Sequence, residues 1–454
     1  MATSDTPHIL IIGGGLGGLC LAQGLAATGL SAAVYERDAG PAVRGQGYRI
    51  TLKQDGVRAL RACLPEHLAE LCAATAIRSA TTMTFLDERL VPKFAKPIPD
   101  QADSDAGFGV NRLTLREILL TGLPGNVHFG KQFQRYETRD GRVVAHFADG
   151  TSATGDLLVG ADGTGSAVRR QLLPDAGLDD LGCFIYGRTP IGPDTMSWLP
   201  EVLTDSFNRV TDAAGTAVSV ATCRAREPYD AAVARLAPGA RLTPVPDYLA
   251  WTISGQGAGV WTLGGAREPR AAGPEELHRL AATLVRDWDP RVGRVIAEAH
   301  VPDTFLVTLA SARPVELWDA SGVTLLGDAV HTMSPGRGEG ANTALRDAAL
   351  LRDALASGRP LAEAVPAYEH EMLRYGFAAV TASRTSPFMP RPATPAPPAG
   401  PRQGPPRPAP HPRAMPPSGT PKPGSPSVSP LPGSPARYPK PGPPPGPRPG
   451  PPPV

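Results

Sequence analysis

The chain has few cysteines, and none of them lies at a metal-ligand or redox-motif spacing. Its 454 residues contain five, at Cys20, Cys63, Cys72, Cys183 and Cys223. No C-x-x-C pair and no Cys/His cluster occurs among them, so we predict no metal site. An odd, scattered set of thiols is typical of core residues in a reducing cytosol. We therefore expect a cytoplasmic protein.

The last 69 residues, 386–454, lack aspartate and glutamate altogether. They contain eight lysines and arginines and 30 of the chain's 53 prolines. Such a segment cannot bury a core, so we expect a disordered, solvated tail. A proline-rich ligand for an SH3-like partner is an alternative that we do not favour. A reading-frame change that replaced the natural ending is another alternative.

The rest of the chain lacks an excess of positive charge. The whole chain has a formal net charge of +2, but residues 1–385 carry 37 basic and 43 acidic side chains. A mildly acidic body argues against nucleic acid as the partner. The uncharged stretch 9–35 is long enough to span a membrane, but its glycine spacing and Asp5 favour a buried strand and helix. We therefore predict a soluble protein with no membrane partner, as a monomer or a homodimer.

The first strand and turn indicate the chemistry. Residues 8–12 form an apolar run that leads into a turn with G-x-G-x-x-G spacing, at Gly13, Gly15 and Gly18. These glycines allow a tight turn, a close approach to a pyrophosphate, and close packing of the helix expected at 19–28. The start of that helix favours phosphates. A second strand, 31–35, ends at Glu36, whose carboxylate can accept both hydroxyls of an adenosine ribose. This order predicts a dinucleotide site.

Two further segments repeat the pattern of a strand, an acidic residue and a glycine-rich turn before a helix. The first follows the strand predicted at 156–160 and contains Asp162 and Gly163. The second follows the strand predicted at 322–328 and continues from Asp328 to Asn342. A carboxylate at a strand end can hold a ribitol hydroxyl, and a helix start favours developing negative charge. The three segments therefore look like parts of one cofactor site.

With these three segments in order, the chain resembles the FAD-dependent aromatic hydroxylases, the single-component flavoprotein monooxygenases similar to para-hydroxybenzoate hydroxylase. The resemblance covers about residues 9–377. It implies FAD as cofactor and NADPH or NADH as co-substrate, with no second dinucleotide fold. The implied FAD-binding residues are Gly13, Gly15, Gly18, Glu36, Arg37, Gly47, Arg112, Asp162, Gly163, Asp328, Gly338, Gly340, Ala341 and Asn342. Arg169 is implied to assist Asp162.

The candidate catalytic residues are Arg44, Arg188, Pro335 and Gly336, of which the resemblance implies the last two. Arg44 lies in a glycine-rich stretch and is the candidate for NADPH or flavin-swing electrostatics, unless it is a solvated surface arginine. Arg188 is expected either to touch substrate or flavin or to form a structural ion pair. His331 is expected to be packed rather than a proton relay, and Trp251 and Trp261 to be core rather than pocket residues. Glu339 stands where relatives often carry glutamine, which leaves the charge at the flavin edge open.

The expected fold class is α/β, or α+β overall: a Rossmann-like FAD-binding domain, an interleaved sheet-rich substrate domain and the disordered proline-rich tail. The expected parts are 1–177 (FAD-binding, with a strand and loop excursion at 80–110), 178–309 (substrate), 310–385 (FAD-binding and closing helices) and 386–454 (tail). Helices are expected at 54–72 with a break at Pro65, 112–120, 273–288, 341–355 and 361–380. A strand pair is expected at 83–94 and a hairpin at 127–147, with its turn at Asp140-Gly141. Further strands are expected at 183–186, 217–223, 249–253 and 260–263.

The implied reaction is reduction of FAD by NAD(P)H, formation of a flavin C4a-hydroperoxide from O2, and transfer of one oxygen atom to an aromatic or polyketide-like small molecule. The motifs do not separate this hydroxylase from a Baeyer–Villiger-type or a non-oxygenating flavin oxidoreductase. A flavin halogenase is disfavoured because the chain lacks a W-x-W-x-I-P segment. A catalytically weak FAD-binding sensor or adaptor that uses the proline-rich tail is the alternative from another class.

Overall fold

The computed structural model describes residues 6–41, 43, 48–98, 107–123, 125–204, 206–255, 269–319 and 322–385. All of them belong to the first of two compact units into which the chain divides, Met1–Thr394 and Pro395–Val454. The predicted disordered tail, 386–454, lies outside the described residues. So do Arg44, Gly47 and Trp261 and the strand expected at 260–263.

A five-stranded parallel sheet stands at the centre of the predicted cofactor region. Its strands run in the order β17 (Val323–Leu325), β11 (Leu157–Gly160), β1 (His8–Ile12), β2 (Ser31–Tyr35) and β7 (Val127–His128). All four neighbouring pairs are parallel. The continuous apolar runs of β1 and β11 are buried, as strands covered on both faces require. Because parallel strands end at the same edge, the turns that follow them converge there.

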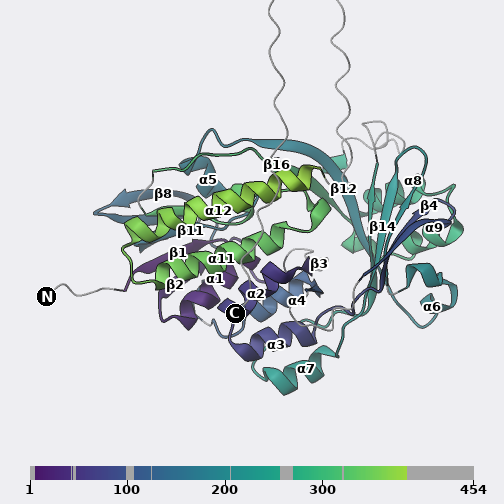
Figure 1. Ribbon diagram of the computed structural model, residues 1–454, viewed down its shortest axis with the longest axis horizontal. Helices are drawn as coiled ribbons and strands as arrows, with labels where there is room; N and C mark the ends of the chain where they lie inside the picture. Colours follow the sequence, from purple (N-terminus) through teal and green to yellow (C-terminus); the bar gives the residue numbers. More distant parts are fainter. Residues whose placement is uncertain are drawn as a thin grey trace, which may run out of the picture. The chain divides into compact units, whose positions relative to one another are not determined.

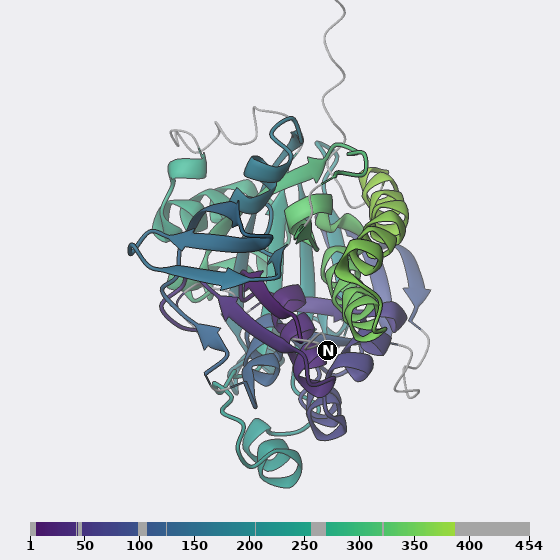
Figure 2. The same cartoon turned by 90° about the vertical axis from the view of Figure 1, so that its left-hand side faces the viewer.

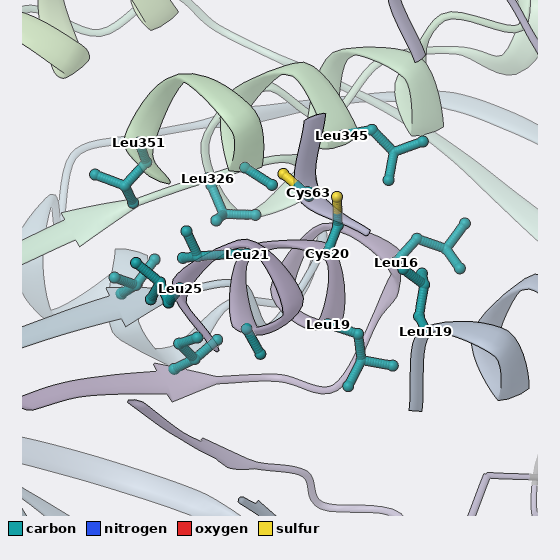
Figure 3. Packing of buried hydrophobic residues seen from close by; sticks show 14 of the residues in the cluster. Leu16, Leu19, Cys20, Leu21, Leu25, Cys63, Leu119, Leu326, Leu345 and Leu351 are labelled. Atoms are coloured by element: carbon teal, nitrogen blue, oxygen red, sulfur yellow. The ribbon is translucent and has the colours of Figure 1, made fainter. Parts of the chain in front are cut away.

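Helices pack closely on this sheet. Figure 3 shows α1 (Leu16–Ala27) beneath α11 (Gly340–Ala356), with leucines of both helices interlocking. Glycine makes this contact possible, because a Cβ on Gly17 would lie 3.2 Å from Ala344 O of α11 and 2.7 Å from Leu326 Cδ1. Helix α1 begins three residues earlier than expected, since the glycines at 17 and 18 belong to its first turn. Helices α11 and α12 (Leu361–Arg384) run side by side (Figure 1).

The second large sheet has seven strands. Its order is β16 (Phe305–Ala312), β12 (Leu178–Pro190), β15 (Tyr248–Ser254), β14 (Ala217–Cys223), β13 (Ser206–Thr211), β4 (Thr82–Asp87) and β5 (Pro92–Pro97). Strands β4 and β5 lie in the predicted excursion 80–110. Strand β12 is far longer than the expected 183–186, because it pairs with both β15 and β16. The expected boundary at 309 falls inside β16, and the division into two domains stays a prediction.

One face of the seven-stranded sheet is closed by α8 (Pro274–Leu284) and α9 (Pro290–Ala297). Their apolar residues form a separate core with Trp251, which is fully buried and donates from Nε1 to Thr189 Oγ1 at 3.1 Å. The expected core role of Trp251 is therefore confirmed. A smaller hydrophobic cluster that includes Tyr186, Cys223, Tyr248 and Ala250 packs on the opposite face of this sheet.

The described residues also form two small sheets. The first pairs β3 (Arg49–Leu52) with β6 (Phe108–Asn111), and the second orders β10 (Ser152–Gly155), β9 (Arg142–Phe147) and β8 (Phe133–Arg139). The predicted hairpin with its turn at Asp140-Gly141 is confirmed as β8 and β9. Its predicted start at 127 is wrong, because Val127 and His128 join the parallel sheet instead. Figure 2 shows the blue strands of the three-stranded sheet on one side of the purple β1 and β2, and the yellow-green α12 on the other.

The remaining helices are mostly short. They are α2 (Gln54–Cys63), α3 (Glu66–Ala74), α4 (Arg112–Leu120), α5 (Ala167–Leu172), α6 (Thr195–Trp198), α7 (Tyr229–Leu236) and α10 (Asp328–His331). The predicted break at Pro65 separates α2 from α3, and the predicted bounds of α4 are confirmed. None of the helices in the described part of the chain has the length and apolar character that a bilayer crossing requires.

Candidate cofactor site

Four predicted segments meet at the carboxyl edge of the parallel sheet. The neighbouring strands β17, β11, β1 and β2 end before Asp328, Asp162, Gly13 and Glu36. Main-chain hydrogen bonds link the exits, from Gly13 N to Tyr35 O at 2.9 Å and from Ala161 N to Ile12 O at 2.8 Å. Segments separated by more than three hundred residues in the sequence therefore lie along one edge of the sheet.

The glycines of the first turn have two different tasks. Gly13 has a φ of +112°, and a Cβ there would lie 2.4 Å from Ala161 O. A Cβ on Gly18 would lie 2.2 Å from Gly13 O, so both positions are closed by backbone. At Gly15 a Cβ would meet no atom within 4 Å, although this residue precedes the first turn of α1. The turn is thus held by Gly13 and Gly18 and is open at Gly15.

The start of α1 is suited to an anion. Its cap residue, Gly15, has no side chain to receive the helix N–H groups, and no acidic residue lies in the first turn. Unpaired N–H groups and the positive end of the helix dipole favour a phosphate there. Together with the open position at Gly15, this geometry fits a pyrophosphate that approaches the backbone.

Glu36 is buried and fixed at the end of β2. Its Oε2 accepts from Gly14 N–H and its Oε1 from Asp38 N–H, each at 2.8 Å. The Arg116 guanidinium lies against it, with Nη2 3.3 Å from Glu36 Oε2. A carboxylate oxygen can accept more than one hydrogen bond, so these contacts leave capacity for ribose hydroxyls. Arg37, the next residue, points outward and is exposed.

Arg116 is a site residue that the sequence analysis missed. Its side chain is only 2 % exposed, and Nε donates to Gly14 O at 2.9 Å and Nη1 to Pro41 O at 2.8 Å. Nη1 also lies 3.6 Å from Asp38 Oδ2. Arg116 therefore joins the glycine turn, the end of β2 and the segment after it. The available signal was its spacing, since it lies one helical turn after Arg112.

Arg112 begins α4 beside the two-stranded sheet. Asn111 caps the helix, its Oδ1 accepting from Leu113 N at 3.0 Å and Thr114 N at 3.3 Å. The Arg112 guanidinium lies 5.6 Å from the centre of the Tyr48 ring, within cation–π range. The predicted phosphate arginine thus sits on an aromatic ring next to β3.

The second segment is shaped by Asp162. Its Oδ1 accepts from Ser166 Oγ at 2.5 Å and its Oδ2 from Ala167 N at 2.7 Å, which fixes the start of α5. Gly163 follows with a φ of +76° and an open Cβ position. Arg169 is buried, which lowers the pKa of its guanidinium, and it donates to Ala329 O and Thr164 O, each at 2.9 Å. It therefore ties the second segment to the third.

The third segment runs from Asp328 through a turn into α11. Asp328 as a residue is exposed at the surface. Protein atoms around its carboxyl nevertheless exclude part of the water, and this desolvation raises the pKa of the carboxyl. Pro335 and Gly336 form a single 3-10 turn, and Gly338 after it is left-handed with a φ of 64°. Gly340 is close to Asp328, since a Cβ there would lie 3.7 Å from Asp328 Oδ1.

Asn342 fastens this turn to the neighbouring sheet. It is 2 % exposed, its Oδ1 accepts from Lys53 N at 2.7 Å, and its Nδ2 donates to Thr51 O at 2.9 Å and Gly338 O at 2.8 Å. The side chain is thus directed at β3 and the turn, while Ala341 before it lies in the first turn of α11. No acidic residue lies in that first turn either, so its N–H groups are suited to negative charge.

A buried polar network supports the third segment from behind. His331 is fully buried, as expected for a packed histidine, and its Nε2 lies 2.7 Å from Asp347 Oδ2. Asp347 also accepts from Gly327 N–H at 2.7 Å and from Tyr375 Oη at 2.5 Å. Burial lowers the pKa of the His331 imidazole, but the Asp347 charge and hydrogen bond outweigh it, so that pKa is raised.

Arg188 is not brought to this edge of the parallel sheet. It lies on β12 of the seven-stranded sheet, with Nε 2.6 Å from Asp303 Oδ2 and its guanidinium 5.9 Å from the Tyr248 ring centre. The ion-pair alternative considered for Arg188 matches this contact.

These features define the class: a dinucleotide-binding α/β protein with a Rossmann-like sheet and its ligand edge at the strand ends. The FAD binding domain family matches residues 6–175 and 260–383. The chain therefore belongs to that family, and the resemblance to FAD-dependent aromatic hydroxylases is confirmed. The donors and open turn described above fit FAD.

Three relatives show the range of the similarity. The chain is 33% identical over 79% of its length to the dual O-methyltransferase/FAD-dependent monooxygenase elcB of Phaeosphaeria nodorum. It is 32% identical over 77% of its length to the FAD-dependent monooxygenase dbaB of Emericella nidulans, covering 86% of that protein. A solved structure of a candidate FAD-containing monooxygenase from Photorhabdus luminescens is 30% identical, with a TM-score of 0.69, over 83% of this chain and 96% of the other.

Some of these relatives are much longer than this chain. It spans 41% of elcB, and about the same share of two related dual O-methyltransferase/FAD-dependent monooxygenases, both called CTB3. The similarity to those proteins thus concerns about two fifths of their length.

Proposed function

We propose that the chain is an FAD-dependent monooxygenase that consumes NAD(P)H and inserts one oxygen atom of O2 into an aromatic or polyketide-like small molecule. The observation that carries the proposal is the alignment of three glycine-rich segments and Glu36 along one edge of the parallel sheet. Membership of the FAD binding domain family and the monooxygenase names of the relatives support it.

The ADP half of the cofactor has candidate ligands on the first two strands. We assign the ribose hydroxyls to Glu36, held in place by Arg116, and the pyrophosphate to the Gly13–Gly18 turn and the start of α1. Arg112 is the candidate for a further phosphate contact. Each of these groups is a hydrogen-bond donor or acceptor of the type that its ligand requires.

The flavin half has candidate ligands on the third segment. When bound, FAD would supply the redox chemistry, accepting a hydride from NAD(P)H and then activating O2 for transfer of one oxygen atom to the substrate. We assign Asp328 to a ribitol hydroxyl. The main chain from Pro335 to Asn342 and the start of α11 present N–H groups that stabilise negative charge on a ring beside them. The roles of Arg44 and Arg188 stay predictions.

The test combines a spectrum with product analysis. The purified chain should show a bound-flavin spectrum, and NADPH or NADH should reduce it faster, without oxygen, when one member of a panel of phenols and polycyclic quinones is present. With isotopically heavy O2, that compound should gain one labelled oxygen. A flavin that is reduced without stimulation and passes its electrons only to hydrogen peroxide contradicts the proposal. A lactone or ester product would instead identify Baeyer–Villiger chemistry.

A further inference from the structure

Two buried thiols, Cys20 and Cys63, meet where helices α1 and α2 pack against each other. Cys20 lies in the first half of α1, and Cys63 is the last residue of α2. Both side chains are fully buried, and the Cys20 thiol donates a hydrogen bond to the Cys63 sulfur. Figure 3 shows the two sulfur atoms close together beneath α11. The fold therefore brings two thiols from different helices into direct contact.

A glycine lets the two helices come this close. Gly24 lies one helical turn after Cys20 on α1, and a Cβ there would lie 3.0 Å from Cys63 Sγ. The same Cβ would lie 2.9 Å from Arg352 Cγ of α11. The Arg352 side chain is 17% exposed, and its Nε lies 3.0 Å from Asp353 Oδ1. A long side chain that reaches the surface, rather than backbone, therefore lies beside the thiols on that side.

The two thiols differ in how readily they ionise. The hydrogen bond from Cys20, with the charge of Arg352, outweighs desolvation and lowers the pKa of the Cys63 thiol. The same hydrogen bond and burial raise the pKa of the Cys20 thiol. Burial raises the pKa of Cys72, on the neighbouring α3, to about 12. Because the thiolate is the reactive form, Cys63 is the candidate nucleophile of this cluster.

A metal site does not account for the cluster. Among the residues that the structure describes, no group of histidine, cysteine, aspartate and glutamate side chains is arranged to hold a metal ion. Two thiols in contact, one of them easier to ionise, are instead the arrangement that dithiol oxidation requires.

We propose that Cys20 and Cys63 form an oxidation site, at which hydrogen peroxide produces a disulfide that fastens α1 to α2. The Cys63 sulfur attacks one peroxide oxygen, the O–O bond breaks, and Cys63 becomes a sulfenic acid as the first water leaves. The Cys20 sulfur then attacks the Cys63 sulfur and displaces the second water. The two sulfurs lose two electrons in total, and the two thiol protons end in the two water molecules.

The disulfide would connect two parts of the candidate cofactor site. Helix α1 begins at the Gly15 turn, whereas the first half of α2 touches the third segment, since a Cβ on Gly56 would lie 2.2 Å from Asn342 Oδ1. A cross-link that closes the loop 20–63 also restricts the unfolded chain. The oxidised protein should therefore melt at a higher temperature and release FAD more slowly than the reduced protein.

The oxidant has a local source if the proposed function holds. Reduced flavin that reacts with O2 without transferring an oxygen atom forms hydrogen peroxide. This source rests on the proposed function, but the disulfide itself does not. A chain without monooxygenase activity should still form the disulfide when peroxide is added, so the two proposals can fail separately.

The test treats the full, FAD-loaded chain with a small excess of hydrogen peroxide and no NAD(P)H. Remaining thiols are alkylated, and the protein is digested with trypsin and a glutamate-specific protease, because cleavage after Glu66 separates Cys63 from Cys72. Mass spectrometry should find a disulfide between the Cys20 and Cys63 peptides that dithiothreitol removes, with Cys72 still alkylated. Unreacted thiols at both positions, or oxidation of Cys63 to a sulfinic acid without a cross-link, overturn the proposal.

Variants connect the disulfide to its effect. Peroxide should raise the melting temperature of the wild type by about 3 °C or more and slow FAD release, and dithiothreitol should reverse both changes. Cys63→Ala and Cys20→Ala should show neither change. Cys72→Ala is the matched control, because Cys72 is a buried residue of the same core and its loss leaves the pair intact.

The comparison of oxidised and reduced wild type stays decisive if an alanine variant does not fold. A disulfide that forms without changing the melting temperature or the rate of FAD release overturns the proposed fastening of α1 to α2. The same stabilisation by peroxide in Cys63→Ala as in the wild type also overturns it, because another residue would then be responsible.

Discussion

The ammonium of Lys53 donates to the carboxylate of Glu339, with Nζ and Oε1 2.5 Å apart. The same lysine donates its main-chain N–H to Asn342, so one residue at the start of α2 holds the turn that precedes α11 twice. Glu339 is the residue whose charge the sequence left open. The pair shows that a cation stands beside this carboxylate at the candidate flavin edge.

Lys53→Met should leave Glu339 as an unpaired anion beside the flavin and make reduction harder. We expect the midpoint potential of bound FAD to fall by about 30 mV, which for two electrons is ~1.4 kcal/mol. Glu339→Gln should raise it, and Lys53→Met with Glu339→Gln should return it close to the wild-type value. Spectroelectrochemical titration measures all four proteins. A double variant whose potential stays as low as that of Lys53→Met would contradict the assignment of this effect to the charge of Glu339.

Arg116→Met should weaken FAD binding by tenfold or more. The substitution removes the group that joins Gly14 O, Glu36 and Pro41 O, and leaves a buried carboxylate without its cation. Loss of one partner from a buried ion pair costs about 3–5 kcal/mol, so a lower melting temperature is also expected. Flavin fluorescence on dilution gives the dissociation constant, and Arg279→Met, at an exposed position of α8, is the control. FAD affinity equal to that of the control would exclude Arg116 from the site.

Gly15→Ala and Gly18→Ala should fail in different ways. At Gly15 a methyl group meets no atom within 4 Å, so the variant should fold with a near-normal melting temperature yet lose FAD affinity, because the methyl occupies the space meant for the pyrophosphate. At Gly18 the methyl would lie 2.2 Å from Gly13 O, so the fold itself should be destabilised. Thermal unfolding and FAD titration of both apoproteins separate the two effects. Normal FAD binding by Gly15→Ala would mean that the pyrophosphate lies elsewhere.

The sequence predicted what depends on local pattern. Strands β1 and β2, helix α4 and the break at Pro65 follow from apolar runs, helical spacing and proline, and each is where it was expected. The meeting of Gly13, Asp162 and Asp328 could also be foreseen, because parallel strands end at one edge.

What the sequence could not give are contacts between distant elements. In the sequence alone, nothing distinguishes Arg116 from other residues of its helix. Its role depends on Glu36 and Gly14, which only the tertiary structure brings beside it. The ion pair of Lys53 joins positions 286 residues apart. The seven-stranded sheet is completed by β4 and β5, which come from a distant part of the chain and join it beside β13. Such features depend on tertiary packing, which no local propensity encodes.

Glu369 should make the stability of the fold depend on pH. Its side chain on α12 is 3 % exposed, and burial raises the pKa of its carboxyl to about 7, with Thr324 and Trp318 opposing that shift in part. Below the unfolded-state value of 4.5 both states hold the proton, so stability is unaffected. As pH rises from 4.5 through about 7, the unfolded state loses its proton first and the free energy of unfolding falls by ~3 kcal/mol.

Glu369→Gln has no ionisable group to bury, so it should lack this loss. We expect its melting temperature to match that of the wild type near pH 5 and to exceed it at pH 8, with the difference opening between these values. Glu363→Gln, an exposed residue of the same helix, should follow the wild type at every pH. Thermal unfolding of the three proteins at pH 5, 6, 7 and 8 provides the comparison. A constant difference between Glu369→Gln and the wild type across this range would mean that Glu369 is already ionised in the fold at pH 5.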